Sequence, residues 1–162
     1  MTPSDWYGDA WRRPGAHDRM QTEVAALLRA RPAPVLPTGT IWMRDIRIEY
    51  PLELRGQVVG YADVMDILTI GFRSTVHILE IKPDIATVAG TIRQCEAYIK
   101  LAEGCIPDVN AVVCSVVTRP DDPLLEKLRE EWPLVWAWGA EMPEPAMTIA
   151  LLAAEAERRA PT

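Results

Sequence analysis

The triplet Glu80-Ile81-Lys82 stands at the end of an apolar, β-branched stretch of the sequence. Side chains two residues apart on a strand point to the same side, so the Glu80 carboxylate and the Lys82 ammonium share a face. Burying two charges at a strand end is costly unless they pair with each other or serve a metal and a phosphate. The triplet is therefore the first candidate for chemistry.

Two acids precede the triplet, Asp63 in the stretch Gly-Tyr-Ala-Asp and Asp66 three residues later. If residues 58–70 and 75–81 form a hairpin with Lys82 opposite Asp63, the Asp63 carboxylate lies on the face of the triplet's two charges. A register that differs by one residue brings Asp66 to that face instead, so both acids remain candidates. Two carboxylates beside a lysine make a hard-oxygen site that suits Mg²⁺ or Mn²⁺ and leaves coordination positions for water and phosphate.

A third pair, Gln94 and Tyr98, follows the triplet along the chain. Residues four apart lie on one stripe of a helix, and apolar residues recur at three- and four-residue steps over 85–102. A helix directly after the strand can lay that stripe along the strand end.

The elements that must position these residues alternate between the two-residue period of strands and the period of about 3.6 residues of helices. Asp18 with Gln21 resembles a capping box, which places the start of a first helix at Asp18. The pattern predicts the order α-β-β-β-α-β-α-β-α, a mixed sheet with helices on both faces. The predicted elements are a helix over 18–31, strands over 41–54, 58–70 and 75–81, a helix over 85–102, a strand over 109–118, a helix over 122–131, a strand over 133–139 and a helix over 146–159.

Composition restricts the class of protein. The chain has 162 residues, 49% hydrophobic and 25% charged, which is the size and balance of one globular domain rather than a disordered or coiled-coil chain. Its apolar runs are too short for a membrane helix and no leader pattern is visible, so we expect a cytoplasmic protein with three free thiols and no membrane partner. The net charge of −6 implies that any phosphate binding rests on local patches.

The ordered combination of Gly-x-x-Asp, Glu-x-Lys at a strand end and Gln-x-x-x-Tyr on the next helix resembles the PD-(D/E)XK nuclease superfamily, specifically its RecB-like branch. The resemblance implies an α/β, restriction-endonuclease-like fold, a mixed β-sheet with an αβββαβ core flanked by helices. It places that core over residues 17–118 of a single nuclease-like domain spanning 1–162. An N-terminal arm over 1–16 and a C-terminal αβα extension over 119–162 complete the domain.

The resemblance also implies roles for the candidate residues. Asp63 and Glu80 would bind the metal together with the backbone carbonyl of Ile81, and Lys82 would position or deprotonate the attacking water. Gln94 and Tyr98 would support the lysine and the substrate backbone. The sequence departs from the family pattern in lacking a proline before Asp63.

Family members often add a metal ligand from the first helix, either a glutamate or a histidine. Glu23 lies at the border of the apolar stripe of that helix, where its carboxylate could face the sheet. His17 lies nearer the centre of the stripe, but only if the helix already includes it. Glu23 is the preferred ligand, and His17 stays open as the alternative.

The function implied by the resemblance is a Mg²⁺- or Mn²⁺-dependent deoxyribonuclease, a hydrolase that cleaves phosphodiester bonds. DNA is the expected partner, and members of the superfamily commonly work as homodimers or in larger assemblies. The alternative is a catalytically inactive nucleic-acid-binding or assembly module that has the same fold.

Overall fold

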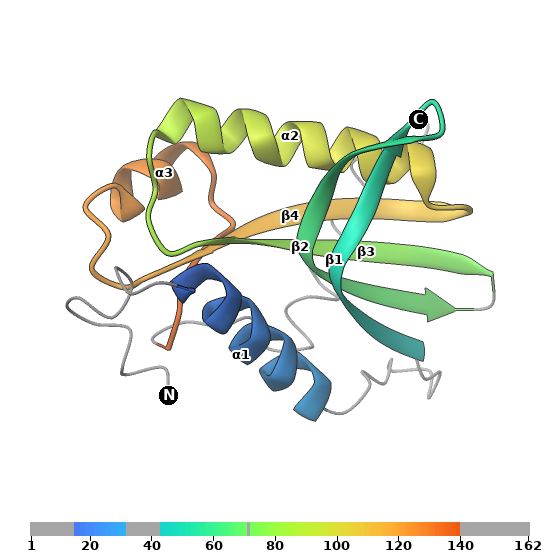
Figure 1. Ribbon diagram of the computed structural model, residues 1–162, viewed down its shortest axis with the longest axis horizontal. Coiled ribbons are helices and arrows are strands. Elements are labelled where there is room, and N and C mark those ends of the chain that lie inside the picture. Colours follow the sequence, from blue (N-terminus) through green and yellow to red (C-terminus); the bar gives the residue numbers. More distant parts are fainter. Residues whose placement is uncertain (1–14, 32–42, 71, 140–162) are drawn as a thin grey trace.

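The computed structural model describes residues 15–31, 43–70 and 72–139. They form a five-stranded mixed sheet with helices on both faces (Figure 1). The elements are α1 (Ala16–Ala30), β1 (Met43–Leu54), β2 (Gln57–Ile70), β3 (Arg73–Lys82), α2 (Val88–Cys105), β4 (Val109–Thr118), α3 (Leu125–Glu131) and β5 (Val135–Ala137).

The strands lie in the order of the sequence, β1-β2-β3-β4-β5. The β1–β2 and β2–β3 pairs are antiparallel, whereas the β3–β4 and β4–β5 pairs are parallel. The step from antiparallel to parallel pairing falls at β3, because α2 carries the chain across the sheet between β3 and β4. The mixed sheet with helices on both faces that the sequence predicts is confirmed.

Two apolar clusters hold the helices to the sheet. On one face α1 packs Met20, Val24 and Leu28, which recur every four residues, against the sheet. On the other face α2 and α3 share a second cluster with side chains that include Val76 and Ile78 of β3. Figure 1 shows α1 below the sheet and α2 above it. Alternate residues of β3 therefore face different helices, which gives this strand a continuously buried sequence.

The register of the β2–β3 hairpin differs from the prediction by two residues. Ile70 pairs with Arg73 and Val64 pairs with Leu79, so this register, continued by one residue, sets Asp63 opposite Glu80 rather than Lys82. The connection between the paired residues is two residues long, and the sequence places a glycine at the first of them, as short hairpins favour. Because the side-chain period is two, this difference leaves each residue on its predicted face.

The first helix begins earlier than the predicted capping box. Gly15 is the N-cap residue, with a φ of 77° that favours glycine, and no side chain caps the helix. The helix therefore includes His17, and Gln21 has a different role, described below.

The remaining predicted elements are present, with ends that differ by a few residues from the expected ones. The predicted helix over 146–159 and most of the predicted N-terminal arm lie outside the described residues. Within the described ranges, none of the helices combines the length and the apolar character that crossing a membrane requires.

Candidate active site

Three of the predicted site residues, Asp63, Glu80 and Lys82, lie where β2 and β3 separate. The ladder between the two strands ends at Val64 and Leu79. Beyond that point β2 continues beside β1, and β3 continues beside β4 as far as Lys82. Asp63 and Glu80 are the first residues past this fork. A fork in a sheet leaves backbone N–H and C=O groups without ladder partners, so side chains must supply their hydrogen bonds.

The Asp63 carboxylate is the hydrogen-bond partner of one of these backbone groups. Its Oδ2 accepts a hydrogen bond from the backbone N–H of Ile81 at 2.8 Å. The side chain is 14% exposed, so it reaches into the fork rather than out to solvent. The predicted contribution of Ile81 was its carbonyl, but the contact seen here is made by its amide.

Glu80 is the most deeply buried charged group of the site. It is 4% exposed, and Oε2 has no hydrogen-bond partner among the described residues. Burial raises the pKa of its carboxyl to about 8, and the negative charge of Asp63 and a hydrogen bond with it act in the same direction. Lys82 and His17 oppose this rise in pKa only partly. Two carboxyl groups therefore share a confined space in which one of them keeps a proton up to slightly alkaline pH.

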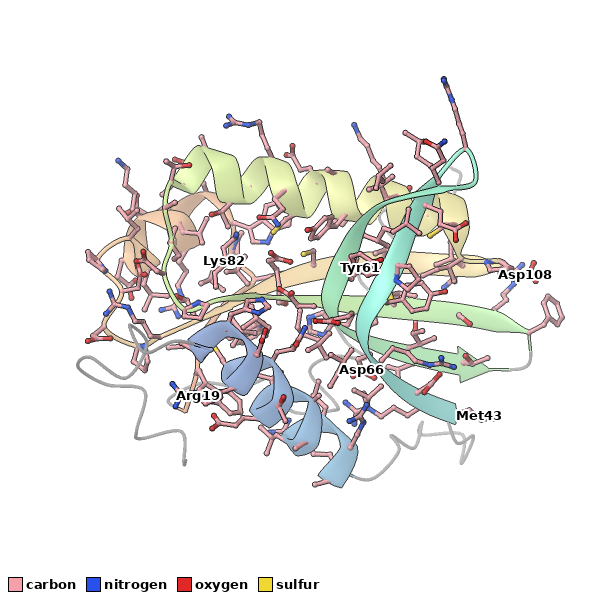
Figure 2. All side chains as sticks on the ribbon, in the orientation of Figure 1. Arg19, Met43, Tyr61, Asp66, Lys82 and Asp108 are labelled. Atoms are coloured by element: carbon pink, nitrogen blue, oxygen red, sulfur yellow. The ribbon has the colours of Figure 1, made fainter. Side chains whose placement is uncertain are left out.

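Lys82 is the cation nearest to Glu80. Its Nζ lies 3.7 Å from Oε1 of Glu80, and its side chain is 22% exposed. Figure 2 shows Lys82 between α2 and the sheet, at the end of β3. The ammonium group thus lies beside the buried Glu80 carboxyl group and stays partly exposed to solvent.

On the α2 side of the site, Gln94 and Tyr98 come from the same helix. The Gln94 amide donates to the Tyr98 hydroxyl at 2.9 Å. Burial raises the pKa of Tyr98, and the charges of Glu80 and Asp63 raise it further, so the phenol lies within electrostatic reach of both. A Cβ on Gly60 would lie 3.7 Å from the Tyr98 ring, so β2 passes directly beside it. Tyr98 thus lies near the two carboxyl groups, whereas Gln94 bonds to Tyr98 rather than to Lys82.

Helix α1 holds Asp63 from the opposite side of the sheet. His17 Nε2 lies 3.0 Å from Oδ1 of Asp63, and its Nδ1 lies 3.1 Å from Oδ1 of Asp18. The hydrogen bond with Asp63 is the largest cause that raises the pKa of His17 to about 9, so the imidazole is a cation at neutral pH. The Gln21 amide donates to the backbone carbonyl of Asp63 at 3.0 Å.

Glu23, the preferred helix ligand in the sequence interpretation, lies elsewhere. Its carboxylate accepts a hydrogen bond from the Trp138 indole N–H at 3.1 Å. The helix brings His17, six residues earlier, to Asp63 instead. The early helix start at Gly15 decides between the two, because it turns His17 toward the fork.

Asp66, the alternative to Asp63, is held away from the site. It points to the α1 face, where Arg44 donates to both of its oxygens, from Nε at 2.9 Å and from Nη2 at 2.6 Å. It is fully buried and stands opposite His77 on β3. This buried ion pair was not foreseen from the sequence, because no local pattern links a residue of β1 to one of β2.

The site can be tested for its fit to a divalent cation. Among the described residues, no three His, Cys, Asp or Glu side chains are arranged as a ready set of metal ligands. The two carboxyl groups of Asp63 and Glu80 nevertheless share a proton-binding space, and one buried oxygen of Glu80 has no partner there. Mg²⁺ and Mn²⁺ are commonly held by one or two carboxylates with water completing the coordination. The donor chemistry of the pair therefore fits such a cation.

The fold and site thus define a mixed α/β protein with two carboxylates and a lysine at a sheet fork. Comparison with protein-family models gives no matching family, and comparisons with curated proteins and with solved structures give no match either.

Proposed function

We propose that this chain is a metal-dependent nuclease with a restriction-endonuclease-like fold, which hydrolyses phosphodiester bonds, most naturally in DNA. The observation that carries the proposal is the meeting of Asp63, Glu80 and Lys82 at the fork, with a buried carboxylate oxygen that lacks a partner among the described residues. The order α1-β1-β2-β3-α2-β4 agrees with the αβββαβ core expected of that superfamily.

In the proposed reaction Asp63 and Glu80 hold Mg²⁺ or Mn²⁺. When bound, the cation supplies an activated water and stabilises negative charge on the phosphoryl oxygens. Lys82 would orient the attacking water and attract the scissile phosphate through its Nζ. His17 keeps the Asp63 carboxylate oriented through the contact at 3.0 Å, and Tyr98 closes the site on the α2 side.

The test is a cleavage assay with Ca²⁺, Mg²⁺ or Mn²⁺ against linear duplex, single-stranded, branched and RNA substrates. We expect cleavage with Mg²⁺ or Mn²⁺ that is lost in Lys82→Ala while the circular dichroism spectrum and melting temperature stay unchanged. Lys100→Ala is the matched control, because Lys100 is exposed on α2. Undiminished cleavage by Lys82→Ala would refute the assignment.

One observation favours the second candidate, a nucleic-acid-binding module without catalysis. Both oxygens of Asp63 already have partners, His17 on one side and the Ile81 amide on the other. If these contacts compete with a cation for the Asp63 oxygens, the same assay would give salt-sensitive binding without strand cleavage under any metal.

A further inference from the structure

Lys82 has a polar neighbour on the adjacent strand, β4. Thr118, the last residue of β4, pairs with Lys82, the last residue of β3. Cys114 and Val116 of β4 belong to the apolar cluster on the α2 face, so by alternation Thr118 lies on the same face as Lys82 and Glu80. The row of side chains that contains Lys82 therefore continues onto β4 at Thr118.

The Thr118 hydroxyl group is buried without a hydrogen-bond partner. The residue is fully buried, and its Oγ1 bonds to none of the described residues. On its other side in the same row stands Ala137 of β5, and two residues earlier on the same face stands Val116. Neither of these side chains has a polar atom, so among these neighbours in the sheet Lys82 is the polar one. A buried polar group that lacks a partner is costly and calls for an explanation.

The Lys82 ammonium group is also short of acceptors. It has three N–H donors, and the contact that the structure gives it in the described part of the chain is the one with Glu80 at 3.7 Å. This distance is that of an ion pair and exceeds the length of a hydrogen bond. An ammonium group held by one long contact can turn on its flexible side chain, so its direction in the site is not fixed.

The backbone of Thr118 is held on both sides, by β3 and β5, and its carbonyl accepts a hydrogen bond from the backbone N–H of Trp138 at 2.8 Å. We propose that Thr118 is a positioning residue, whose hydroxyl accepts a hydrogen bond from Lys82 Nζ when Glu80 is engaged elsewhere and thereby fixes the direction of the ammonium group. The contact requires a rotation of the Lys82 side chain, which its partial exposure permits. The role in catalysis rests on the proposed function, whereas the contact itself can be measured without it.

The direct test follows the ammonium group by NMR in EDTA, without nucleic acid. The chain has three lysines, and Lys100 and Lys127 are exposed, so protein labelled with ¹⁵N-lysine gives a simple ammonium spectrum. In Glu80→Gln, which removes the negative charge that Lys82 faces, we expect a Lys82 ammonium signal whose protons exchange slowly with water. Adding Thr118→Val should speed that exchange by about tenfold, the lower end of what one hydrogen bond to a charged group contributes.

Two further variants separate positioning from a structural role. Thr118→Ser keeps the hydroxyl and should retain slow exchange. Thr75→Val is the matched control, since Thr75 is a buried threonine near the other end of β3 whose hydroxyl donates to the Leu68 carbonyl at 3.3 Å. In urea denaturation Thr75→Val should lower the midpoint, whereas Thr118→Val should not, because the hydroxyl that it removes has no partner. A larger loss of stability in Thr118→Val than in Thr75→Val would overturn the proposal in favour of a structural role.

The second arm measures cleavage with Mg²⁺ or Mn²⁺ over a range of substrate concentrations. We expect Thr118→Val to lower kcat by about tenfold with KM nearly unchanged, as the loss of an interaction made in the transition state requires. Thr118→Ser should retain most of the activity, and Thr75→Val should match the wild type. If the valine variant does not fold, Thr118→Ala takes its place in both arms.

The outcomes distinguish this inference from the nuclease proposal. Cleavage that is undiminished in Thr118→Val overturns the positioning role, while the nuclease proposal stands. Faster ammonium exchange in Thr118→Val, with no cleavage by the wild type under any metal, supports the contact and refutes the nuclease proposal. Unchanged exchange in Thr118→Val, or a serine variant that exchanges as fast as the valine variant, overturns the contact.

Discussion

Replacing Glu80 by glutamine should make the metal-free protein more stable while it removes the proposed activity. Glu80 is 4% exposed and faces Asp63, which together raise the pKa of its carboxyl to about 8 from an ordinary 4.5. The unfolded chain releases this proton near pH 4.5 and the folded chain near pH 8. At pH 7 the folded state must therefore retain a proton that the unfolded state has lost, at a free-energy cost of about 3 kcal/mol.

The sign of the effect gives a pH signature. Because the pKa is raised in the folded state, the contribution of Glu80 to stability is most favourable below pH 4.5 and declines as the pH rises toward 8. Glutamine has nearly the same shape and no proton to lose. Its advantage over glutamate should be small at about pH 4.5 and reach about 3 kcal/mol at pH 7, or roughly 6 to 12 °C in melting temperature for a domain of this size.

The assay is urea denaturation in EDTA at several pH values between about 4.5 and 8, for the wild type, Glu80→Gln and the control Glu96→Gln, which changes an exposed residue of α2. Added Mg²⁺ or Mn²⁺ should then stabilise the wild type and not Glu80→Gln, since a ligand that binds the folded state raises its stability. A difference between wild type and Glu80→Gln that does not grow with pH would refute the placement of two carboxyl groups in one confined site.

Three further predictions concern the surroundings of the site. Asp66→Asn leaves Arg44 charged and buried without its carboxylate, so we expect a loss of about 3–5 kcal/mol in urea denaturation, and a near-neutral result would contradict the buried pair. Burial lowers the pKa of His77 to about 4, so stability should fall as the pH drops from 6.5 toward 4, and His77→Gln should flatten that fall in acid denaturation. His17→Ala should weaken metal affinity and cleavage by about 10- to 100-fold in titrations with Mn²⁺, because it frees Asp63 to reorient, whereas an unchanged titration would exclude this supporting role.

The sequence was sufficient to predict the sheet and the two faces of its strands. Apolar residues recur every two residues in strands and about every four in helices, and this pattern stays visible when the ends of an element are misplaced slightly. The strands and α2 were therefore predicted to within a few residues. The hairpin register was wrong by two residues, yet Asp63 and Glu80 still face the same space, because an even shift preserves the alternation. An odd shift would have exchanged Asp63 for Asp66.

The choice between Glu23 and His17 could not be made from periodicity. Glu23 lies at the border of the apolar stripe and His17 nearer its centre, but His17 belongs to the stripe only if the helix begins before it. Gly15 sets that start through a left-handed conformation, for which the preceding Pro-Gly dipeptide is only a general signal of a turn. The partner that occupies Glu23, the indole of Trp138, is 115 residues away in the sequence. Such a contact depends on tertiary packing that local patterns do not encode.

The buried polar groups of the α1 face were missed for the same reason. Arg44, Asp66, His77 and Ser115 come from four successive strands of the sheet, and they are linked by an ion pair, a cross-strand pairing and a hydrogen bond of 2.6 Å between His77 and Ser115. His77 lies within an apolar stretch of sequence and is buried. Its partner could be identified only once the order of the strands was known.

The fork explains how one small domain can hold two acids in a buried place. Glu80 lies on the α2 face of β3 and Ile81 on the α1 face, so consecutive residues are fixed by the two separate apolar clusters. Asp63 bridges them, because its carboxylate accepts from the Ile81 amide while its charge acts on Glu80. The unfavourable proximity of the carboxyl groups is therefore offset by packing on both faces of the sheet. Loosening either apolar cluster should let the two carboxyl groups move apart. A fold that holds two carboxyl groups together in this way marks a candidate functional site, which is the basis of the proposed cation site.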